Sequence, residues 1–411
     1  MAFDIVVLGA GMVGVSAALH LAQRGHAVTL VDRAAPGSET SYGNAGIIQR
    51  EAVEPYAFPR DWRVLLDVAL RRGVDVNYHL GALPALAPRL AAYWRASSPD
   101  RYPRIAAEYG RLIAHSVSEQ ASLIEAADAA DLVAKQGYRH VFRSAAKLDE
   151  AVQRARRLER DYGVRHAVLD GAGLAQAEPA LRQGLAGAVQ WLDPWCVNDP
   201  GELAARYARL LVRRGGRLVR GEVRGLEPHA GGWRIRTDDA PLAAQHVVVA
   251  LGPWAGRWIE PLGYRLPLFV KRGYHRHYTG GPALAMPMLD AEKGFVLVPT
   301  AKGTRLTTGA EFAPLHAPPT PRQLFEAERL ARGLIDLPTP VEAQPWMGCR
   351  PCTVDMKPVI GPAPRHPGLW FDFGHAHQGF TLGPVSGRLI ADLIEGRTPF
   401  LDPAPFAATR F

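Results

Sequence analysis

Apolar and polar residues follow two different periods along this 411-residue chain. A short apolar run, Ile5–Leu8, leads into a glycine-rich turn and then into apolar positions at helical spacing up to about Arg24. A second apolar run, residues 27–31, stops at Asp32. The pattern therefore predicts a strand, a tight turn, a helix and a second strand with an acid at its end.

The rest of the chain divides into a helical stretch and a strand-rich stretch. Helical periodicity covers residues 61–72, 83–96, 104–131 and 147–162. Strand patterns cover residues 217–220, 233–237, 246–252, 267–271, 294–299 and 304–308. Near the end, the apolar run 369–373 meets glycines and then a helical pattern over 381–395. This last unit predicts a second strand-to-helix turn like the first.

This order of elements predicts an α/β fold with two domains. We expect a Rossmann-like nucleotide-binding domain that is discontinuous in sequence, and an α+β domain with an antiparallel sheet. The first domain is predicted to contain residues 1–60, 147–262 and 344–411, and the second residues 61–146 and 263–343.

The glycine turn has the spacing of a dinucleotide site. Gly9 permits the tight turn, Gly11 lets the backbone approach a pyrophosphate, and Gly14 allows close packing of the helix. Asp32 stands where an acid binds ribose hydroxyls, which favours NAD or FAD over a 2′-phosphate, although the adjacent Arg33 leaves that alternative open. A glycine turn without a ligand is the structural alternative.

Composition narrows the class of protein. The net charge is +8, and no basic run reaches the density of a nucleic-acid site, so we expect no nucleic-acid partner. Three cysteines (196, 349 and 352) suit a reducing compartment, and their spacing supports no metal site. No apolar stretch reaches about twenty residues. We expect a cytoplasmic protein, with peripheral attachment to the inner face of the cytoplasmic membrane as an alternative.

The second strand-to-helix turn, residues 374–381, carries candidate chemistry. Its backbone N–H groups and helix dipole can stabilise negative charge, as a reduced flavin requires. His375 and His377 are candidates for a general base or metal ligands, or they simply fill space. Arg350 can fix a carboxylate with its planar guanidinium, or it forms a surface ion pair.

Four ordered motifs together resemble the D-amino-acid oxidase superfamily of FAD enzymes, and more closely its bacterial D-amino-acid dehydrogenases and hydroxy-D-proline dehydrogenases. The motifs are Gly9–Gly14 with Asp32, residues 39–41 with Asn44–Gly46, residues 348–361, and residues 374–384. Two departures stand out: Ala376 replaces a glycine, and Cys349 and Cys352 replace apolar or small residues.

The resemblance implies non-covalently bound FAD and a set of site residues. The cofactor residues implied are Gly9, Gly11, Met12, Val13, Gly14, Asp32, Arg33, Thr40, Ser41, Asn44, Ala45, Gly46, Val223, Gly252, Trp254, Gly374, His375, Gly379, Phe380 and Thr381. The residues implied around the substrate are Arg350, which would bind its carboxylate, and Tyr274, Arg272, His375 and Tyr56, with Glu54 in the same loop as Tyr56.

The implied reaction is oxidation of a D-amino acid by hydride transfer from Cα to flavin N5, giving an imine and then a 2-oxo acid and ammonia. The electrons are expected to pass to a quinone or another carrier. A proline-type or N-methyl amino acid dehydrogenase or oxidase is the alternative within this class. A flavoprotein subunit of a larger complex and a tRNA-modifying FAD enzyme are the alternatives from other classes.

Overall fold

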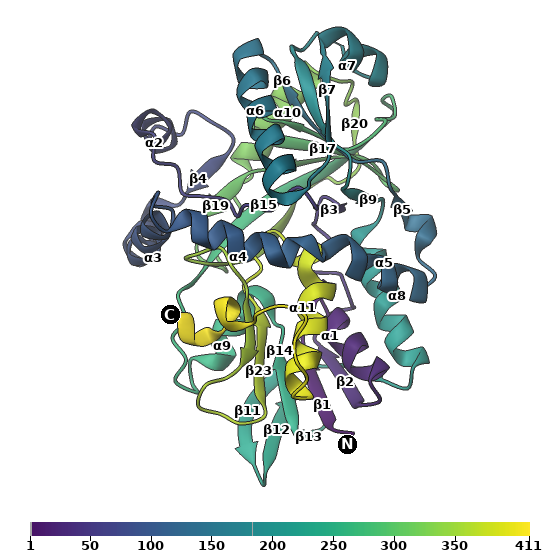
Figure 1. Cartoon of the computed structure of the whole chain (residues 1–411), viewed down its shortest axis with the longest axis vertical. Helices are drawn as coiled ribbons and strands as arrows, with labels where there is room; N and C mark the ends of the chain where they lie inside the picture. The colour runs from purple at the N-terminus through teal and green to yellow at the C-terminus, as the bar shows by residue number, and fades with distance from the viewer. Residues whose placement is uncertain (1, 183) are drawn as a thin grey trace.

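Two β-sheets of different size organise the chain in the computed structural model, which describes residues 2–182 and 184–411 (Figure 1). The smaller sheet has six strands among these residues, in the order β10 (Arg217–Arg220), β2 (Ala27–Asp32), β1 (Asp4–Leu8), β14 (His246–Val249), β23 (Leu369–Phe373) and β22 (Val359–Pro362). The first five are parallel and β22 is antiparallel. This is the Rossmann-like sheet that the sequence predicts, assembled from three separate parts of the chain.

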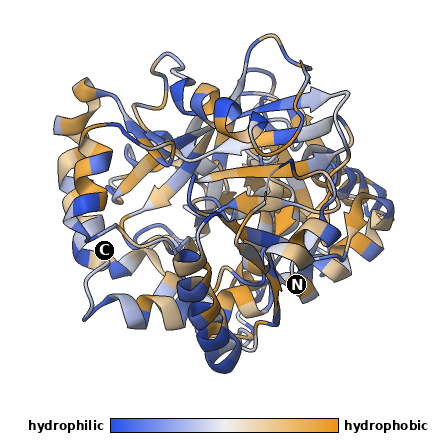
Figure 2. Ribbon diagram, turned by 90° about the horizontal axis from the view of Figure 1, so that it is seen from above, coloured by the Kyte–Doolittle hydropathy of each residue, from blue (hydrophilic) through white to orange (hydrophobic). Residues whose placement is uncertain are grey.

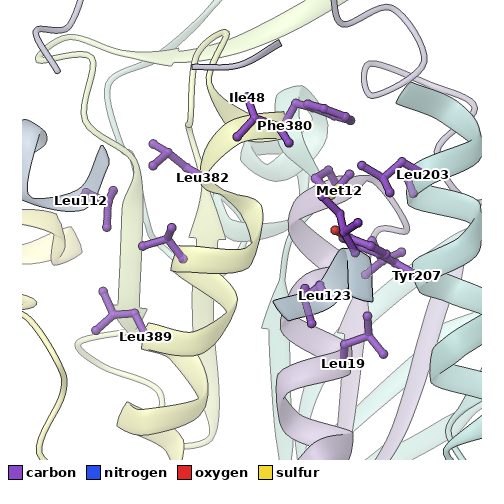
Figure 3. Packing of buried hydrophobic residues seen from close by; sticks show 14 of the residues in the cluster. Met12, Leu19, Ile48, Leu112, Leu123, Leu203, Tyr207, Phe380, Leu382 and Leu389 are labelled. Atoms are coloured by element: carbon purple, nitrogen blue, oxygen red, sulfur yellow. The ribbon is translucent and has the colours of Figure 1, made fainter. Parts of the chain in front are cut away.

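Helices cover one face of this sheet and form the main core with it. They are α1 (Met12–Gln23), α8 (Pro200–Arg213) and α11 (Gly379–Ile394), with α4 (Tyr102–Ala114) and α5 (Ser116–Ala126) packed outside them. Figure 3 shows Leu19 of α1, Tyr207 of α8 and Leu389 of α11 among the buried side chains there. Helices α1 and α11 approach so closely that a Cβ at Gly383 would lie 2.9 Å from the Met12 carbonyl oxygen. The missing side chain of this glycine therefore permits the contact.

The larger sheet is mixed and has eleven strands within the described residues. Nine of them follow the order β4 (Val76–Tyr78), β19 (Ala310–Phe312), β15 (Leu268–Thr279), β18 (Gly303–Thr308), β17 (Phe295–Thr300), β16 (Met288–Asp290), β6 (Tyr138–Phe142), β8 (Gly187–Trp191) and β7 (His166–Asp170). The other two, β20 (Thr339–Pro340) and β21 (Trp346–Thr353), pair with β15. Strand β15 is therefore the central element of this sheet.

Smaller elements complete the chain. Two three-stranded sheets contain β11 (Val223–His229), β12 (Gly232–Thr237) and β13 (Leu242–Ala244), and β3 (Ile47–Ile48), β9 (Trp195–Val197) and β5 (Val133–Ala134). The remaining helices are α2 (Trp62–Ala69), α3 (Leu83–Ala96), α6 (Ala145–Tyr162), α7 (Gly171–Ala177), α9 (Ala255–Ile259) and α10 (Arg322–Arg332). Seen from above, hydrophobic residues follow the strands in the interior, whereas hydrophilic residues concentrate on the outer helices (Figure 2).

Three expectations about elements and boundaries need correction. The predicted helix 104–131 is two helices, α4 and α5, which meet at His115. The segment 147–262 does not lie wholly with the nucleotide-binding sheet, because β7 and β8 hydrogen-bond into the larger sheet beside β6. Strand β21 likewise pairs with β15, although the prediction placed 344–411 with the nucleotide-binding domain. Hydrogen bonding between strands that lie far apart in sequence, rather than chain order, decides this division.

Helix α2 is unusual because none of its residues is buried. It lies with α3 at the edge of the molecule, away from the main core (Figure 1). Neither helix could cross a bilayer, and the same holds for every other helix in residues 2–182 and 184–411.

Candidate active site

A cavity of about 910 Å³ lies between the two sheets and is lined by residues of both. This volume is at the upper end of the range for ligand pockets. The predicted cofactor residues that line it are Gly9, Gly11, Met12, Val13, Asp32, Arg33, Thr40, Ser41, Asn44, Ala45, Val223, Gly252, Trp254, Gly374, His375, Gly379 and Phe380. Segments from both ends of the chain and from its middle thus meet around one space.

Three predicted cofactor residues, Gly14, Gly46 and Thr381, support the cavity from behind rather than lining it. A Cβ at Gly14 would lie 1.8 Å from the Gly9 carbonyl oxygen, so only glycine lets the helix begin this close to the turn. Gly46 has a φ of +69°, and its carbonyl accepts a hydrogen bond from the Val197 amide. The Thr381 hydroxyl accepts a hydrogen bond from the Gln49 amide. Through these contacts the three residues hold the backbone that surrounds the cavity.

The end of β2 presents a half-buried carboxylate, Asp32, beside the glycine turn. Asp32 Oδ2 accepts a hydrogen bond from the Ala10 amide at 2.6 Å and Oδ1 accepts one from the Ala34 amide at 2.9 Å. Burial raises the pKa of Asp32, and these two amides act in the opposite direction. The Arg33 guanidinium lies over the Trp254 ring at 4.4 Å and forms a 3.0 Å ion pair with Glu39. Arg33 therefore already has an anionic partner.

The turn before α11 has an alanine, Ala376, at a position where the related pattern has glycine, and the backbone there is strained. Ala376 has a φ of +51°, a left-handed conformation that costs an L residue about 1–2 kcal/mol and that the glycine of the related pattern would adopt freely.

The same turn carries two histidines. Burial lowers the pKa of His375 to about 3, and burial together with the positive charges of Arg350 and Lys271 lowers the pKa of His377 to about 3. Both rings are neutral at pH 7, which makes them weak bases there.

Arg350 lies in the cavity wall on β21. Its Nη1 donates to the Gly309 carbonyl at 2.7 Å, and its Nη2 lies 3.4 Å from the Thr308 carbonyl. A Cβ at Gly273 would come within 2.6 Å of Nη2, so this glycine makes room for the guanidinium. No carboxylate within the described residues forms an ion pair with Arg350, and burial lowers its pKa. Among residues 2–182 and 184–411, no carboxylate therefore neutralises this guanidinium in the cavity.

Arg272 does not reach the cavity, contrary to expectation. Neighbouring residues of a strand point to opposite faces, so Lys271 lines the cavity while Arg272 points away from it. The Arg272 guanidinium is fully buried and pairs with Glu311 at 2.5 Å. Lys271 is thus a cavity residue that the sequence prediction did not select. Alternation along β15 shows only that Lys271 and Arg272 face opposite sides of the sheet, and the pairing of the strand decides which of them meets the cavity.

Of the other residues predicted around the substrate, Tyr274 and Tyr56 line the cavity and Glu54 does not. Tyr274 contributes to the cavity wall, but its hydroxyl donates to Glu311 at 2.6 Å on the far side of the strand. Tyr56 lines the cavity, and its ring meets the His377 ring edge-on at a centroid distance of 4.4 Å. Glu54 instead pairs with Arg154 and Arg157 of α6. Of these three side chains, that of Tyr56 is the one with a ring contact to a cavity histidine.

Apolar side chains form the wall opposite the glycine turn. They come from the segment around α2, α3, β4 and β19, and they are Phe58, Leu65, Val68, Val76, Tyr78, Leu83, Leu90, Tyr93 and Phe312. A wall of this kind keeps water away from a bound ligand and strengthens electrostatic contacts inside.

Comparison with known proteins identifies the family of this fold and site. The profile described as DAO, FAD-dependent oxidoreductase, matches residues 4–393. The chain belongs to the DAO family of FAD-dependent oxidoreductases. The resemblance drawn from the four motifs is therefore confirmed, and the cofactor is FAD.

Two curated relatives of the DAO-family chain match it over nearly its whole length. It is 31% identical to a D-amino-acid oxidase of Bradyrhizobium diazoefficiens over 99% of this chain and 98% of that one. It is 32% identical to a D-amino acid dehydrogenase of Cereibacter sphaeroides over 99% and 95%. Among solved structures, glycine oxidase from Geobacillus kaustophilus covers 100% of this chain with a TM-score of 0.74 at 23% identity, and 99% of that chain is covered. The last match confirms the predicted α/β fold.

The DAO-family cofactor fits the residues present. Gly9, with a φ of +105°, makes a cradle that a side chain would fill, because a Cβ there would meet the Ala250 carbonyl oxygen at 2.5 Å. Helix α1 begins at Met12, whose amide donates to the Ser41 hydroxyl at 2.9 Å, and it has no acidic residue in its first turn. A helix N-terminus free of acidic side chains suits a pyrophosphate, because the positive end of the helix dipole attracts the anion.

Proposed function

We propose that this protein is a D-amino-acid dehydrogenase that uses non-covalently bound FAD. Its membership of the DAO family supports the broader statement that it is an FAD-dependent oxidoreductase acting on amino acids. The observation that carries the proposal is Arg350, a half-buried residue in the cavity wall whose guanidinium donates, within the described residues, only to backbone carbonyls. A substrate carboxylate is the partner that such a fork binds with two hydrogen bonds.

In this proposal the side chains position the substrate and exclude water. Arg350 holds the carboxylate, Tyr56 and the neutral His377 ring bound the same space, and the apolar wall around α2 and α3 covers it. When bound, FAD supplies the acceptor for the hydride that leaves the substrate Cα. Because positioning accounts for a large part of the barrier reduction, the reaction needs no strong general base. The low pKa of both turn histidines agrees with this view.

The preference for D-isomers rests on relatives. The two curated proteins at 31% and 32% identity are named for D-amino acids. Hydroxyproline, proline and N-methyl amino acids remain candidates to be compared directly, because the same carboxylate contact would serve them.

Anaerobic mixing tests this function. The purified yellow protein is mixed with D-, L- and N-methyl amino acids and with hydroxyproline isomers, and the loss of oxidised-flavin absorbance is followed. Reduction by D-amino acids alone is the expected result. Reduction by L-isomers or by hydroxyproline alone would replace the D-amino-acid assignment, and a flavin that no member reduces would favour a partner-dependent flavoprotein subunit.

We further propose that electrons leave to a quinone or another carrier, with peripheral contact at a membrane. One relative is named an oxidase and the other a dehydrogenase, so the acceptor needs its own test. The segment around α2 and α3 is the best placed for the contact, since Trp62, Leu70 and Leu80 are exposed there beside Arg71 and Arg72. Turnover with a soluble quinone should exceed turnover with oxygen at least tenfold, and faster turnover with oxygen would reverse the assignment.

A further inference from the structure

Two cationic side chains stand side by side at the substrate end of the cavity. Lys271 of β15 and Arg350 of β21 are register partners in an antiparallel pair. Residues directly opposite in such a pair project to the same face of the sheet. Both side chains line the cavity. The pairing of the two strands therefore places two positive charges in one space.

Their charged groups point to different surroundings. The guanidinium of Arg350 turns to the carbonyls of Thr308 and Gly309. The Lys271 Nζ lies 3.3 Å from the Tyr93 hydroxyl and 4.5 Å from the centre of the Tyr93 ring. The sulfur of Met356 is 4.0 Å from the same nitrogen. The two cations thus form two separate points of attachment rather than one cluster around a single oxygen pair.

Lys271, like Arg350, has no anionic partner among the described residues. Its neighbours are a phenol, a thioether and aromatic rings, which attract an ammonium without neutralising it. Burial, and to a smaller extent Arg350, lower the pKa of Lys271. Lys271 is half-buried in this wall, and a partly desolvated cation without a counter-charge favours an anion that reaches it.

One carboxylate, Asp75, also lines this part of the cavity. It forms no ion pair with either cation, and its pKa is raised by burial and by Asp290. A Cβ at Gly294 would lie 1.4 Å from its Oδ1, so its side chain is packed against the backbone of that loop. With the substrate α-carboxylate on Arg350, the charge of Lys271 remains unmatched.

We propose that Lys271 binds a second acidic group of the substrate, so that the preferred substrates are amino acids with a carboxylate side chain. This inference rests on the proposed function, since it assigns the substrate class of the same site. Glutamate and glutamine, or aspartate and asparagine, differ in charge at nearly constant shape. They are therefore the probes that isolate Lys271.

The first test uses the unaltered holoenzyme. Apparent dissociation constants are measured from the rate of anaerobic flavin reduction by glutamate and by glutamine, in whichever enantiomer reduces the flavin. One charge-assisted contact predicts about 10- to 100-fold tighter binding of glutamate. Equal binding of both, with flavin reduction intact, would overturn the role of Lys271 and leave the proposed function standing. Absence of reduction by every amino acid would instead reject the proposed function.

The second test uses the variant Lys271→Met, which removes the charge and keeps much of the apolar stem. The glutamate-to-glutamine ratio should fall to about one, and Lys271→Arg should restore part of it. Lys147→Met, at an exposed lysine paired with Glu150, is the matched control for the loss of one positive charge. If Lys271→Met weakens glutamate and glutamine equally, Lys271 binds the α-carboxylate together with Arg350 and the second-acid proposal is wrong.

A binding measurement without turnover completes the design. Glutarate and its monoamide are titrated into the oxidised holoenzyme, and the change in flavin absorbance reports their affinity. Wild type should bind glutarate at least about tenfold more tightly than the monoamide, and Lys271→Met should bind both alike. The flavin content of each variant is measured first, so that a folding defect is recognised. Equal affinities in the wild type would count against the proposal.

Discussion

The two ends of the cavity are built by different means. At the glycine end, backbone groups and one carboxylate from residues 4–32 shape much of the surface, and residues 250–254 complete it. At the other end, side chains of β15 and β21 meet an apolar wall from α2 and α3. The first end depends on the absence of side chains at glycines, and the second depends on which face of a strand a side chain occupies. Substitutions should therefore have different consequences at the two ends.

The largest effect is expected from Gly14→Ala at the glycine end. The new Cβ would meet the Gly9 carbonyl oxygen at 1.8 Å, and backbone cannot move aside as a side chain can. We expect a loss of about 4 kcal/mol or more in the free energy of unfolding and no bound flavin after purification. The flavin-to-protein absorbance ratio measures this. Gly81→Ala is the control, because a Cβ there meets nothing within 4 Å, and equal flavin content in both variants would contradict the account.

Arg272→Met should reveal a structural residue next to the substrate end. The substitution leaves the buried Glu311 carboxylate without its guanidinium, which costs about 3–5 kcal/mol of folding stability. Urea unfolding followed by tryptophan fluorescence reports the loss. The apparent substrate dissociation constant of the folded fraction should stay within about threefold of the wild type. A large rise in that dissociation constant with unchanged folding stability would show that Arg272 contributes to substrate binding after all.

Arg350→Met should show the reverse of Arg272→Met: a large loss of catalytic efficiency with flavin content unchanged. Removing the carboxylate partner of a buried contact costs about 2–4 kcal/mol, so kcat/KM should fall about 30- to 1,000-fold. Flavin content should not change, because the side chain makes its hydrogen bonds with Gly309 and Thr308, far from the glycine turn in sequence. Steady-state kinetics with a matched flavin assay separates the two quantities. A decrease of less than threefold would exclude Arg350 as the anchor.

Glu51→Gln tests whether a buried carboxyl group behind the cavity wall makes folding stability depend on pH. Glu51 is buried and accepts a hydrogen bond from Gln49, whose side chain lines the cavity. Burial raises its pKa from 4.5 to about 7, so the folded state holds a proton that the unfolded state releases between those pH values. The free energy of unfolding therefore falls as pH rises through this window, by about 1–3 kcal/mol.

The variant lacks this contribution, so its stability relative to wild type should rise between pH 5 and pH 8. Urea unfolding at four pH values in that range provides the measurement, and Glu125→Gln, at an exposed glutamate of α5, is the control. A constant difference across the range would show that Glu51 does not titrate there.

Much of the glycine end could be predicted from sequence because its information is local. The turn, the helix and the acid at Asp32 follow one another within 32 residues, and each position has its own steric or electrostatic reason. The strand 246–252 and the turn at Gly374 were likewise recognised from apolar runs that end in glycine. The structure of such segments follows from residues that are close together in the sequence.

The larger sheet was harder to predict because its strands find partners far along the chain. Strands β6, β7 and β8 have few β-branched residues and lie among helical patterns, so the sequence analysis assigned none of them. The choice between Lys271 and Arg272 shows the same difficulty at one residue. A sequence pattern locates the strand, but the face that meets the cavity depends on pairing with β21 and β19.

Strand β15 gives the protein a way to change its substrate without changing its fold. Its twelve residues pair with β18, β19, β20 and β21, so main-chain bonds hold it in place whatever the side chain at position 271. A single codon change there would exchange an ammonium for a neutral or acidic group at the far end of the cavity, while the glycine end stays intact. In evolutionary terms, a substitution at position 271 would alter substrate selectivity while the residues that hold the cofactor stay unchanged.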